Sequence, residues 1–256
     1  MKAPVLVDVR RIEFQDKPKP VIRLGEVLVK VEYCGICGSD VHGYLNGIVI
    51  PVGTVMGHEF SGVVAEVGEE VYGVRPGDRV VVKPSASCLG CYWCRRGQYS
   101  LCPKRRETII GISPENDGAY AEYVRIRYPG QMVFKLPPGL ATREAALVEP
   151  LSIALHGVRL SRFKLGDCAL IIGAGMIGLG VLQFLKLEGT SKIIVLEISE
   201  RKGRVARELG ADVVLNPISE GKRLREHLFE LTDGIGADIV FDCAGVPSAF
   251  QIFMDC

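Results

Sequence analysis

Three side chains of types that bind Zn²⁺ stand near the start of the chain. Cys37 lies in the stretch Cys-Gly-Ile-Cys-Gly-Ser-Asp-Val-His at residues 34–42, and His58 and Glu59 follow as a pair. A thiolate, an imidazole and a carboxylate can hold a zinc ion, which polarises an alcohol oxygen or a carbonyl when one position stays open. A single cysteine is otherwise a small apolar residue, and a lone histidine is more often structural. The three residues are therefore candidate ligands of a catalytic metal.

A second set of metal-ligand types is a cluster of four cysteines, three of them at every third residue: Cys88, Cys91, Cys94 and Cys102. Four thiolates can surround one tetrahedral Zn²⁺ and leave no open position, which predicts a structural site. The alternative is a set of free or disulfide-bonded cysteines. The chain has nine cysteines, an odd number, and the tight spacing favours metal chemistry in a reducing compartment. We therefore expect a cytoplasmic protein.

A glycine-rich motif, Gly-Ala-Gly-Met-Ile-Gly at residues 173–178, follows an apolar strand-like run and precedes a helical pattern. In a dinucleotide-binding loop, Gly173 makes the tight turn, Gly175 lets the backbone approach a pyrophosphate, and Gly178 allows close packing of helix on strand. The N-terminus of the following helix then offers N–H groups to the phosphates. Ile177, within the motif, is counted with the cofactor-binding residues. A glycine-rich turn without a ligand is the alternative.

An acidic residue, Glu197, ends the next strand-like run, about 20 residues after the loop, as dinucleotide-binding folds require. A carboxylate there accepts hydrogen bonds from the ribose hydroxyls and repels a 2′-phosphate, which favours NAD over NADP. Arg201 and Lys202 follow closely and could accommodate a phosphate. Lys202 is counted as a cofactor-binding residue.

The elements that must position these residues change character along the chain. Residues 1 to about 84 contain short apolar runs broken by Gly and Pro, which predicts a small closed or partly closed β-barrel. Residues 118–124 return to a strand-like pattern. From residue 168 onward, strand and helix patterns alternate, which predicts an α/β fold with a doubly wound parallel sheet.

Composition excludes several classes of protein. The 256 residues are 48% hydrophobic and 24% charged, with a net charge of +1, so a packed core is expected and disorder is not. Acidic and basic residues are mixed, which argues against a nucleic-acid or membrane surface. The N-terminal residues lack the apolar core of a signal peptide, and no uncharged apolar run reaches transmembrane length.

Five stretches resemble one known family: CGICGSDVH at 34–42, GHEFSGVV at 57–64, the cysteine cluster at 88–102, VEPLSIALHGV at 148–158 and GAGMIG at 173–178. The chain resembles the zinc-containing medium-chain alcohol dehydrogenase superfamily, within its polyol branch of sorbitol, 2,3-butanediol and threonine dehydrogenases. The resemblance implies a GroES-like β-barrel catalytic domain over 1–155 and a Rossmann NAD-binding domain over 156–256. Family members continue beyond the fourth Rossmann strand, so we expect a domain that is incomplete at its C-terminus.

The resemblance also implies roles for individual metal-site residues. Cys37 and His58 match catalytic zinc ligands, and Glu59 matches a ligand in some states of the enzymes. Glu149, in the Val-Glu-Pro motif, is similar to the carboxylate that binds the metal or its water in polyol enzymes. Ethanol-type enzymes resemble the chain less, because they carry a cysteine at that position.

Ser39 and His42 match a proton-relay pair of the family, and a hydroxyl and an imidazole near Cys37 can carry a proton to solvent near neutral pH. Cys34 is expected to be packed rather than bound to metal. Three further cysteines have no ligand pattern and are expected to be structural: Cys168, Cys243 and Cys256.

The predicted function is transfer of a hydride from a secondary alcohol of a small diol or polyol to NAD, with two zinc ions per chain, one catalytic and one structural. The resemblance favours 2,3-butanediol and leaves sorbitol and threonine open. No nucleic-acid or membrane partner is expected, and a full-length form is expected to be a homo-oligomer. The alternative is a truncated, non-catalytic remnant that still binds zinc and nucleotide.

Overall fold

The computed structural model describes residues 1–255, so the prediction for Cys256 falls outside the described residues. The chain divides into two compact units, Met1–Glu149 and Pro150–Cys256. Each unit has its own apolar core and its own sheet. The domain boundary predicted between residues 155 and 156 falls inside helix α4 (Val148–Leu160).

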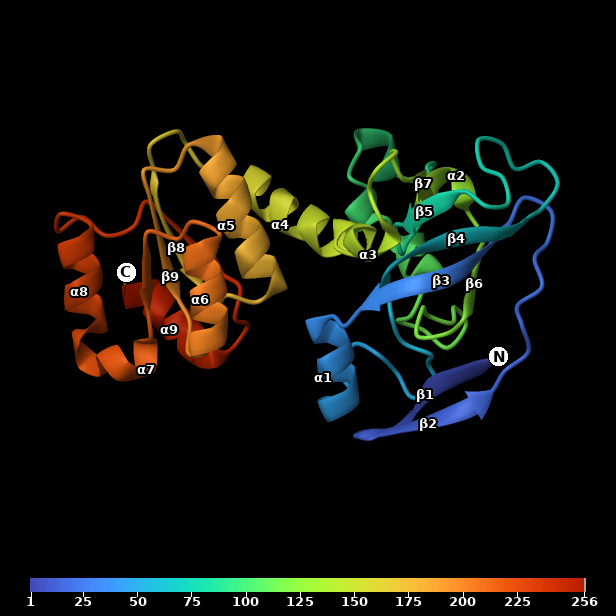
Figure 1. The fold of residues 1–256 in the computed structure, drawn as a ribbon, viewed down its shortest axis with the longest axis horizontal. Coiled ribbons are helices and arrows are strands. Elements are labelled where there is room, and N and C mark those ends of the chain that lie inside the picture. Colours follow the sequence, from blue (N-terminus) through green and yellow to red (C-terminus); the bar gives the residue numbers. More distant parts are fainter. Residues whose placement is uncertain (256) are drawn as a thin grey trace. The chain divides into compact units, whose positions relative to one another are not determined.

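The first unit is built on an antiparallel sheet with the strand order β6-β3-β4-β5-β7, and β1 and β2 form a separate pair. Figure 1 shows β3, β4 and β5 side by side. β6 alternates half-buried with buried residues, whereas β3 and β4 each begin with a run of buried residues. Their bounds are β1 (Lys2–Asp8), β2 (Arg11–Asp16), β3 (Val27–Gly35), β4 (Glu59–Val67), β5 (Arg79–Val82), β6 (Tyr123–Ile126) and β7 (Val133–Lys135).

Helices in the first unit are short and lie in the connections between strands: α1 (Gly38–Asn46), η1 (Cys94–Arg96), η2 (Tyr99–Leu101), η3 (Pro103–Thr108), α2 (Pro129–Met132) and α3 (Thr142–Ala145). The helix α1 ends at Gly47, which adopts the left-handed conformation with φ of 66°. It therefore carries the residues that follow Cys37 in a fixed helical array.

The strand predicted at residues 118–124 is wrong over residues 118–122, since β6 begins only at Tyr123. Residues 118–120 instead cross the segment before β4, where the N–H groups of Gly118 and Tyr120 donate to the carbonyls of Val55 and Met56. A Cβ on Gly118 would lie 2.2 Å from the Met56 carbonyl oxygen. The crossing is thus possible because residue 118 has no side chain.

The second unit is a parallel sheet with the strand order β10-β9-β8-β11. The first strand of the unit, β8, lies inside the sheet. The next two strands are added on one side of it and β11 on the other, so the strand order reverses at β8, as in a doubly wound dinucleotide-binding fold. The bounds are β8 (Cys168–Ile172), α5 (Met176–Glu188), β9 (Lys192–Leu196), α6 (Glu200–Glu208), β10 (Val213–Leu215), α7 (Pro217–Glu220), η4 (Gly221–Arg223), α8 (Leu224–Leu231), β11 (Ile239–Asp242) and α9 (Pro247–Asp255).

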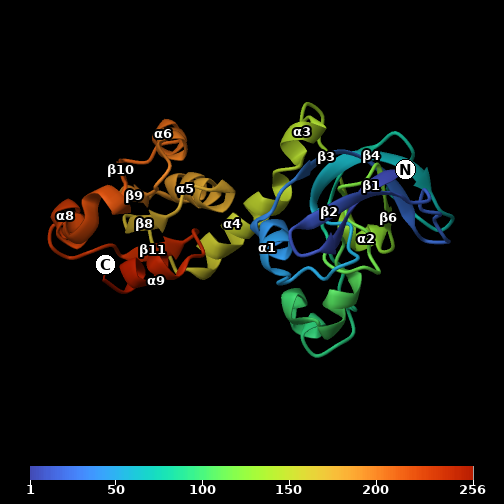
Figure 2. The ribbon, with the colours of Figure 1, turned by 90° about the horizontal axis from the view of Figure 1, so that it is seen from below.

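Helices cover both faces of this sheet. Ala169 and Ile171 face the cluster that includes α4, α5 and α6, whereas Leu170 and Ile172 face the cluster that includes α8 and α9. Figure 2 shows α5 and α6 on one side of β8 and β9, with α8 and α9 on the other. Burial on both faces explains why residues 168–172 form a continuous apolar run rather than an alternating one.

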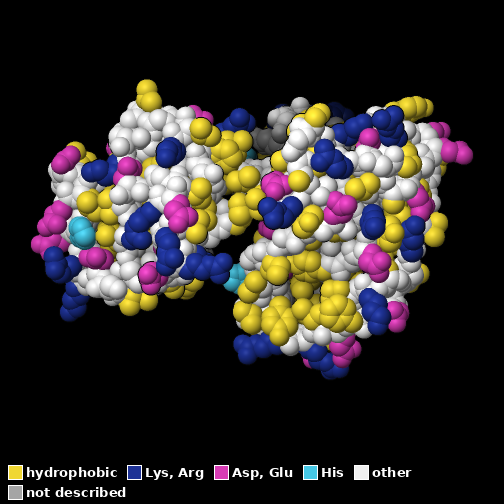
Figure 3. Space-filling view, viewed as in Figure 1, with side chains coloured by type: hydrophobic (Ala, Val, Ile, Leu, Met, Phe, Trp, Pro, Cys, Tyr) yellow, Lys and Arg dark blue, Asp and Glu magenta, His cyan; other side chains and the backbone are white. Residues whose placement is uncertain are grey.

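Apolar side chains are also exposed on the first unit. Figure 3 shows them gathered over α1 and the neighbouring strands β1 and β2. Exposed members on and near these elements are Val9, Val41, Leu45, Ile48 and Val49. Among residues 1–255, no helix combines the length and the apolar character that a membrane span needs.

Two leucines of the second unit test this account of the core. Leu170 in β8 is fully buried, whereas Leu187 in α5 is 83% exposed. We expect Leu170→Ala to lower the free energy of unfolding by roughly 2–5 kcal/mol, because it leaves a cavity between strand and helices. Leu187→Ala should change it by no more than about 0.5 kcal/mol. Urea unfolding followed by circular dichroism measures both, and equal effects would contradict the assigned core.

Candidate active site

The fold brings Cys37, His58 and Glu59 together, with one potential ligand atom from each lying within 4.8 Å of the others. Cys37 is the N-cap residue of α1, His58 precedes β4, and Glu59 is the first residue of that strand. His58 and Glu59 are 6% and 7% exposed. A half-buried thiol, a buried imidazole and a buried carboxyl group that converge in this way form a donor set that suits Zn²⁺.

Two glycines make this approach possible. Gly35, opposite Glu59 in the β3–β4 pairing, would place a Cβ 2.4 Å from the Glu59 carboxylate oxygen Oε2. Gly57 has a φ of 98°, and a Cβ there would lie 2.8 Å from the Tyr120 backbone nitrogen. Any other residue at either position would displace the carboxylate or the backbone that presents His58.

Sequence reasoning missed Asp40, a buried carboxylate that supports this group. Its Oδ2 accepts a 2.9 Å hydrogen bond from the Cys37 backbone N–H. Its Oδ1 lies 3.7 Å from His58 Nδ1, and within the described residues neither of these two buried atoms has a hydrogen-bond partner. An acidic residue three positions after a candidate ligand was the available signal, since it lies on the same helical turn.

The orphaned pair Asp40 Oδ1 and His58 Nδ1 has a simple explanation if His58 binds a cation through Nε2. A metal-bound imidazole almost always donates its other N–H to a carboxylate or carbonyl, which fixes the ring and its tautomer. Ser39 Oγ lies 3.4 Å from Nε2, on the side opposite to Asp40. The residues present therefore fit a zinc ion held by Cys37 and His58, with Glu59 beside it.

Burial controls the protonation of the candidate ligands. It raises the pKa of the Cys37 thiol, against hydrogen bonds from Ser39 that lower it. It also raises the pKa of Glu59, while a hydrogen bond from Cys37 lowers it. A half-buried thiol and a buried carboxyl group that resist ionisation are expected where a cation normally compensates the charge.

Glu149 lies near this group but is not a member of it. Burial raises its pKa, and the charges of His58 and Glu59 act on it in opposite directions, lowering and raising it respectively. It is half-buried in the first turn of α4. The structure therefore brings Glu149 within electrostatic range of the candidate ligands, without placing it among the three that converge.

Ser39 and His42 are three residues apart on α1, so they lie on one face of the helix. Ser39 is half-buried beside His58, and His42 is exposed to solvent. Among the described residues, no hydrogen bond joins Ser39 directly to His42. A proton that passes between them needs a bridging hydroxyl group or water.

The four cysteines at 88, 91, 94 and 102 also converge, with all four sulfur atoms within 4.8 Å of one another. Cys94 Sγ lies 3.5 Å from Cys91 Sγ and 3.9 Å from Cys88 Sγ. Backbone N–H groups of Gly90 and Cys91 lower the pKa of Cys88 to about 6, which favours its thiolate. Four thiols that converge without disulfide geometry fit one tetrahedral Zn²⁺.

The loop that carries the four cysteines is closed at its base. The Thr108 hydroxyl accepts a hydrogen bond from the Ala86 N–H and donates one to the Ala86 carbonyl. The Gln131 amide exchanges two hydrogen bonds with the backbone of Ser87. The remaining described cysteines, Cys34, Cys168 and Cys243, pack instead against the apolar cores.

In the second unit, the glycine motif forms a turn from β8 into α5. Gly173 has a φ of 97°, and a Cβ on Gly178 would lie 1.9 Å from the Gly173 carbonyl oxygen. Gly175 is the N-cap residue of α5 without a side-chain cap, and a Cβ there would meet open space. The first N–H groups of α5, including that of Ile177, lie at the end of the helix that attracts phosphate.

Glu197 has a structural task that sequence reasoning did not anticipate. Its Oε2 accepts a hydrogen bond of 2.7 Å from the Ala174 N–H, and its Oε1 accepts one of 2.8 Å from the Ser199 N–H. Glu197 therefore holds the glycine loop in place, and each oxygen keeps a lone pair for a ribose hydroxyl. Lys202 is exposed in the first turn of α6, where its backbone N–H donates to the Ser199 hydroxyl.

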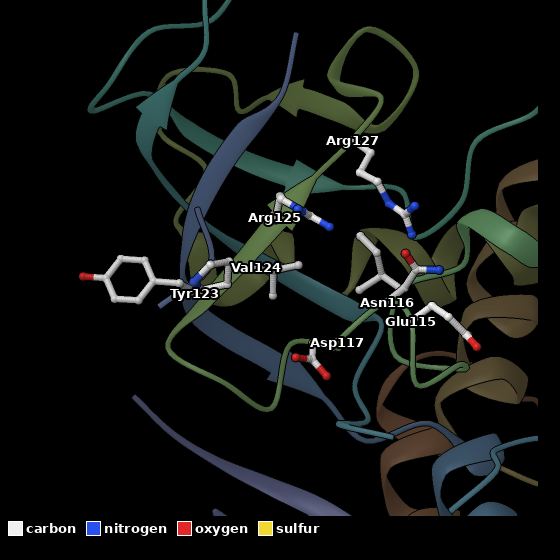
Figure 4. Close-up of a pocket in the computed structure, with 9 residues that line it drawn as sticks. Glu115, Asn116, Asp117, Tyr123, Val124, Arg125 and Arg127 are labelled. Carbon is white, nitrogen blue, oxygen red and sulfur yellow. The ribbon is translucent and has the colours of Figure 1, made fainter. Parts of the chain in front are cut away.

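A separate cavity of about 100 Å³ lies against β6 in the first unit. Figure 4 shows Arg127 directed toward Asn116, with Glu115 and Asp117 on the same loop. None of its lining residues belongs to the two metal-ligand groups. Its mixture of positive and negative side chains favours no single class of ligand.

Two glycines of the nucleotide loop should respond differently to the same substitution. We expect Gly178→Ala to lower the free energy of unfolding by roughly 1–3 kcal/mol, because the new methyl group meets the Gly173 carbonyl. Gly175→Ala should keep the stability within about 0.5 kcal/mol but weaken NADH binding by about tenfold or more, because the methyl group occupies the path of the pyrophosphate. Chemical unfolding and fluorescence titration with NADH distinguish the two. Unchanged NADH affinity of the Gly175→Ala chain would refute this role.

Comparison with known proteins agrees with these sites. Residues 23–138 match the family model of the alcohol dehydrogenase GroES-like domain, and residues 177–256 match that of the zinc-binding dehydrogenases. The chain is 40% identical to the (R,R)-butanediol dehydrogenase of Bacillus subtilis over 93% of its own length and 68% of the relative's. It is 36% identical to the sorbitol dehydrogenase of the same organism, over 98% of its own length and 70% of the relative's. The chain thus spans about two thirds of the length of these curated relatives.

Among solved structures, a putative zinc-binding dehydrogenase from Sinorhizobium meliloti bound to NADP is 35% identical, with a TM-score of 0.85 over 97% of this chain and 71% of that one. The expected pair of a GroES-like domain and a Rossmann fold is confirmed. The family model that matches residues 177–256 describes zinc-binding dehydrogenases, and the Sinorhizobium meliloti protein was solved with a nicotinamide cofactor, NADP. The chain therefore belongs to the zinc-dependent medium-chain alcohol dehydrogenases, in their polyol branch.

Proposed function

We propose that this chain oxidises a secondary alcohol of a small diol or polyol and transfers the hydride to NAD, with 2,3-butanediol as the favoured substrate. The observation that carries the proposal is the convergence of Cys37, His58 and Glu59 in a chain that also holds a complete dinucleotide loop. The butanediol dehydrogenase relative supports the substrate. The sorbitol dehydrogenase relative keeps sorbitol as the second candidate.

The proposed cofactor is NAD rather than NADP. The solved relative bound to NADP shows that a cofactor with a 2′-phosphate fits a related protein. In this chain, Glu197 is fixed at the end of β9 by two backbone N–H groups, so it cannot easily move away from a 2′-phosphate. Repulsion between two negative charges at that position supports NAD.

The chemistry divides between the metal and the protein. Zinc at Cys37 and His58, with Glu59 or Glu149 beside it, would lower the pKa of the substrate hydroxyl. The proton would then pass to Ser39 and, through a bridging hydroxyl group or water, on to His42, whose imidazole is exposed and can release it to solvent. Glu149, whose pKa is raised by burial, can hold a proton or a water molecule beside the substrate. A nicotinamide cofactor held at the glycine loop of residues 173–178 would supply the acceptor for the carbon-bound hydrogen, as a hydride.

A second zinc ion is proposed at Cys88, Cys91, Cys94 and Cys102, with a structural role. Its support is the closed set of four sulfur atoms, which leaves no position for a substrate. We further propose that the complete enzyme forms homo-oligomers, has no nucleic-acid or membrane partner, and works in the cytoplasm.

The substitution Cys37→Ser tests the proposed site. We expect it to reduce NAD-dependent oxidation of 2,3-butanediol by at least about 10²-fold, because the thiolate ligand is lost. Bound zinc should fall from two ions per chain to one, since the four-cysteine site is untouched. The activity assay and elemental analysis measure both.

The matched control is Cys168→Ser, which removes a thiol outside both metal-ligand groups. It should keep both zinc ions and full turnover. Full activity of the Cys37→Ser chain would refute the assignment. An unmodified chain that binds two zinc ions and NADH but oxidises none of butanediol, sorbitol and threonine would favour the non-catalytic alternative.

A further inference from the structure

The Tyr120 hydroxyl reaches the metal-ligand group from a distant part of the sequence. Its oxygen lies 2.9 Å from Asp40 Oδ2 and 3.1 Å from the Gly35 carbonyl oxygen. A tyrosine hydroxyl has one proton to donate, and a carboxylate is the stronger acceptor. The hydroxyl therefore donates to Asp40, with the Gly35 carbonyl as a secondary acceptor.

This contact completes the set of groups that orient the Asp40 carboxylate. Oδ2 accepts from both the Cys37 N–H and the Tyr120 hydroxyl, so the carboxylate is held by two donors on one oxygen. Oδ1 is thereby turned toward His58 Nδ1, 3.7 Å away. Asp40 is 2% exposed, so water does not compete for these positions. Without the hydroxyl, the Cys37 N–H would be the one hydrogen-bond donor left to this carboxylate among residues 1–255.

The backbone of Tyr120 is tied to the segment that presents His58. Its N–H donates to the Met56 carbonyl, and the Ala119 N–H donates to the Gly57 carbonyl. The Tyr120 ring lies so close to Gly57 that a Cβ there would meet the ring carbon Cδ1 at 2.8 Å. The hydroxyl and the imidazole are therefore placed by a shared piece of backbone.

We propose that Tyr120 is a positioning residue of the metal site, which acts through Asp40 to hold His58 with Nδ1 toward the carboxylate and Nε2 toward the metal. The inference rests on the proposed function, because it assumes that Cys37 and His58 bind the catalytic metal. A cation at Nε2 makes the Nδ1–H a stronger donor, so the 3.7 Å contact gains strength when the metal binds. Tyr120 itself touches neither metal nor substrate in this assignment.

The test is the Co²⁺ affinity of the full chain with Tyr120→Phe, which removes only the hydroxyl. Co²⁺ alone is the probe, and its visible absorption reports on each site, with the Cys37→Ser chain identifying the bands of the four-cysteine site. We expect Co²⁺ to bind the Cys37–His58 site about tenfold more weakly, as for other partners of metal-bound histidines. The four-cysteine site should keep its affinity. The matched control, Tyr72→Phe, removes a hydroxyl from a tyrosine that is 89% exposed, and should change neither site.

Repeating the measurement in an Asp40→Asn background shows whether Tyr120 acts through Asp40. In that background, Tyr120→Phe should weaken Co²⁺ binding by less than about twofold, because interacting residues do not have additive effects. A tenfold loss in both backgrounds would overturn the proposal. So would equal weakening of both metal sites, which would indicate a general loss of structure.

A measurement on the unsubstituted chain keeps the proposal testable if a variant fails to fold. The chain has four histidines, so ¹⁵N spectra of its imidazoles can be assigned by substitution. The proposal requires His58 to carry its proton on Nδ1 in the Co²⁺-free chain, and a proton on Nε2 would overturn it. An unsubstituted chain that binds Co²⁺ only at the four cysteines would refute the proposed function, whereas equal affinities of the Tyr120→Phe and unsubstituted chains would refute only the role of Tyr120.

Discussion

The geometry of the candidate active site depends on one buried carboxylate. Asp40 is almost inaccessible to water and has no Lys or Arg partner among the described residues; its Oδ2 accepts from the Cys37 N–H and the Tyr120 hydroxyl, and its Oδ1 faces His58 Nδ1. A buried charge of this kind is costly unless every neighbouring donor is well placed. The N-cap of α1, the start of β4 and the crossing segment at 118–120 all contribute to that placement. The positions of Cys37 and His58 follow from it.

Steric constraints act together with this electrostatic one. Gly35 and Gly57 sit where side chains would collide with Glu59 or with the backbone next to Tyr120. The same principle operates in the second unit, where Gly178 lies against the Gly173 carbonyl and lets α5 start directly after β8. In both units, the absence of a side chain brings two backbone segments close enough to create a site.

Local motifs predicted much of this molecule, because their chemistry depends on short spacing. The four cysteines converge as their spacing indicated, and the turn from β8 into α5 has the expected conformation. The spacing of residues within a motif could not reveal contacts between residues that are far apart in the sequence. The pairing of Tyr120 with Asp40 joins residues 80 positions apart, and the strand-like pattern at 118–124 concealed the crossing that makes it. Glu197 was predicted as a ribose acceptor, yet its hydrogen bonds to the Ala174 and Ser199 N–H groups could not be read from residue types.

The ligands of both metal-ligand sets lie before residue 150, and so do the residues that support them. The dinucleotide loop and Glu197 lie after it. Each part also packs its own core. Metal chemistry and cofactor choice are therefore encoded in separate stretches of the gene. Mutations that alter the preference between two cofactors can accumulate without passing through forms that lose the metal. Recombination near the codons for α4 could combine an existing metal site with a different cofactor-binding unit in a single event.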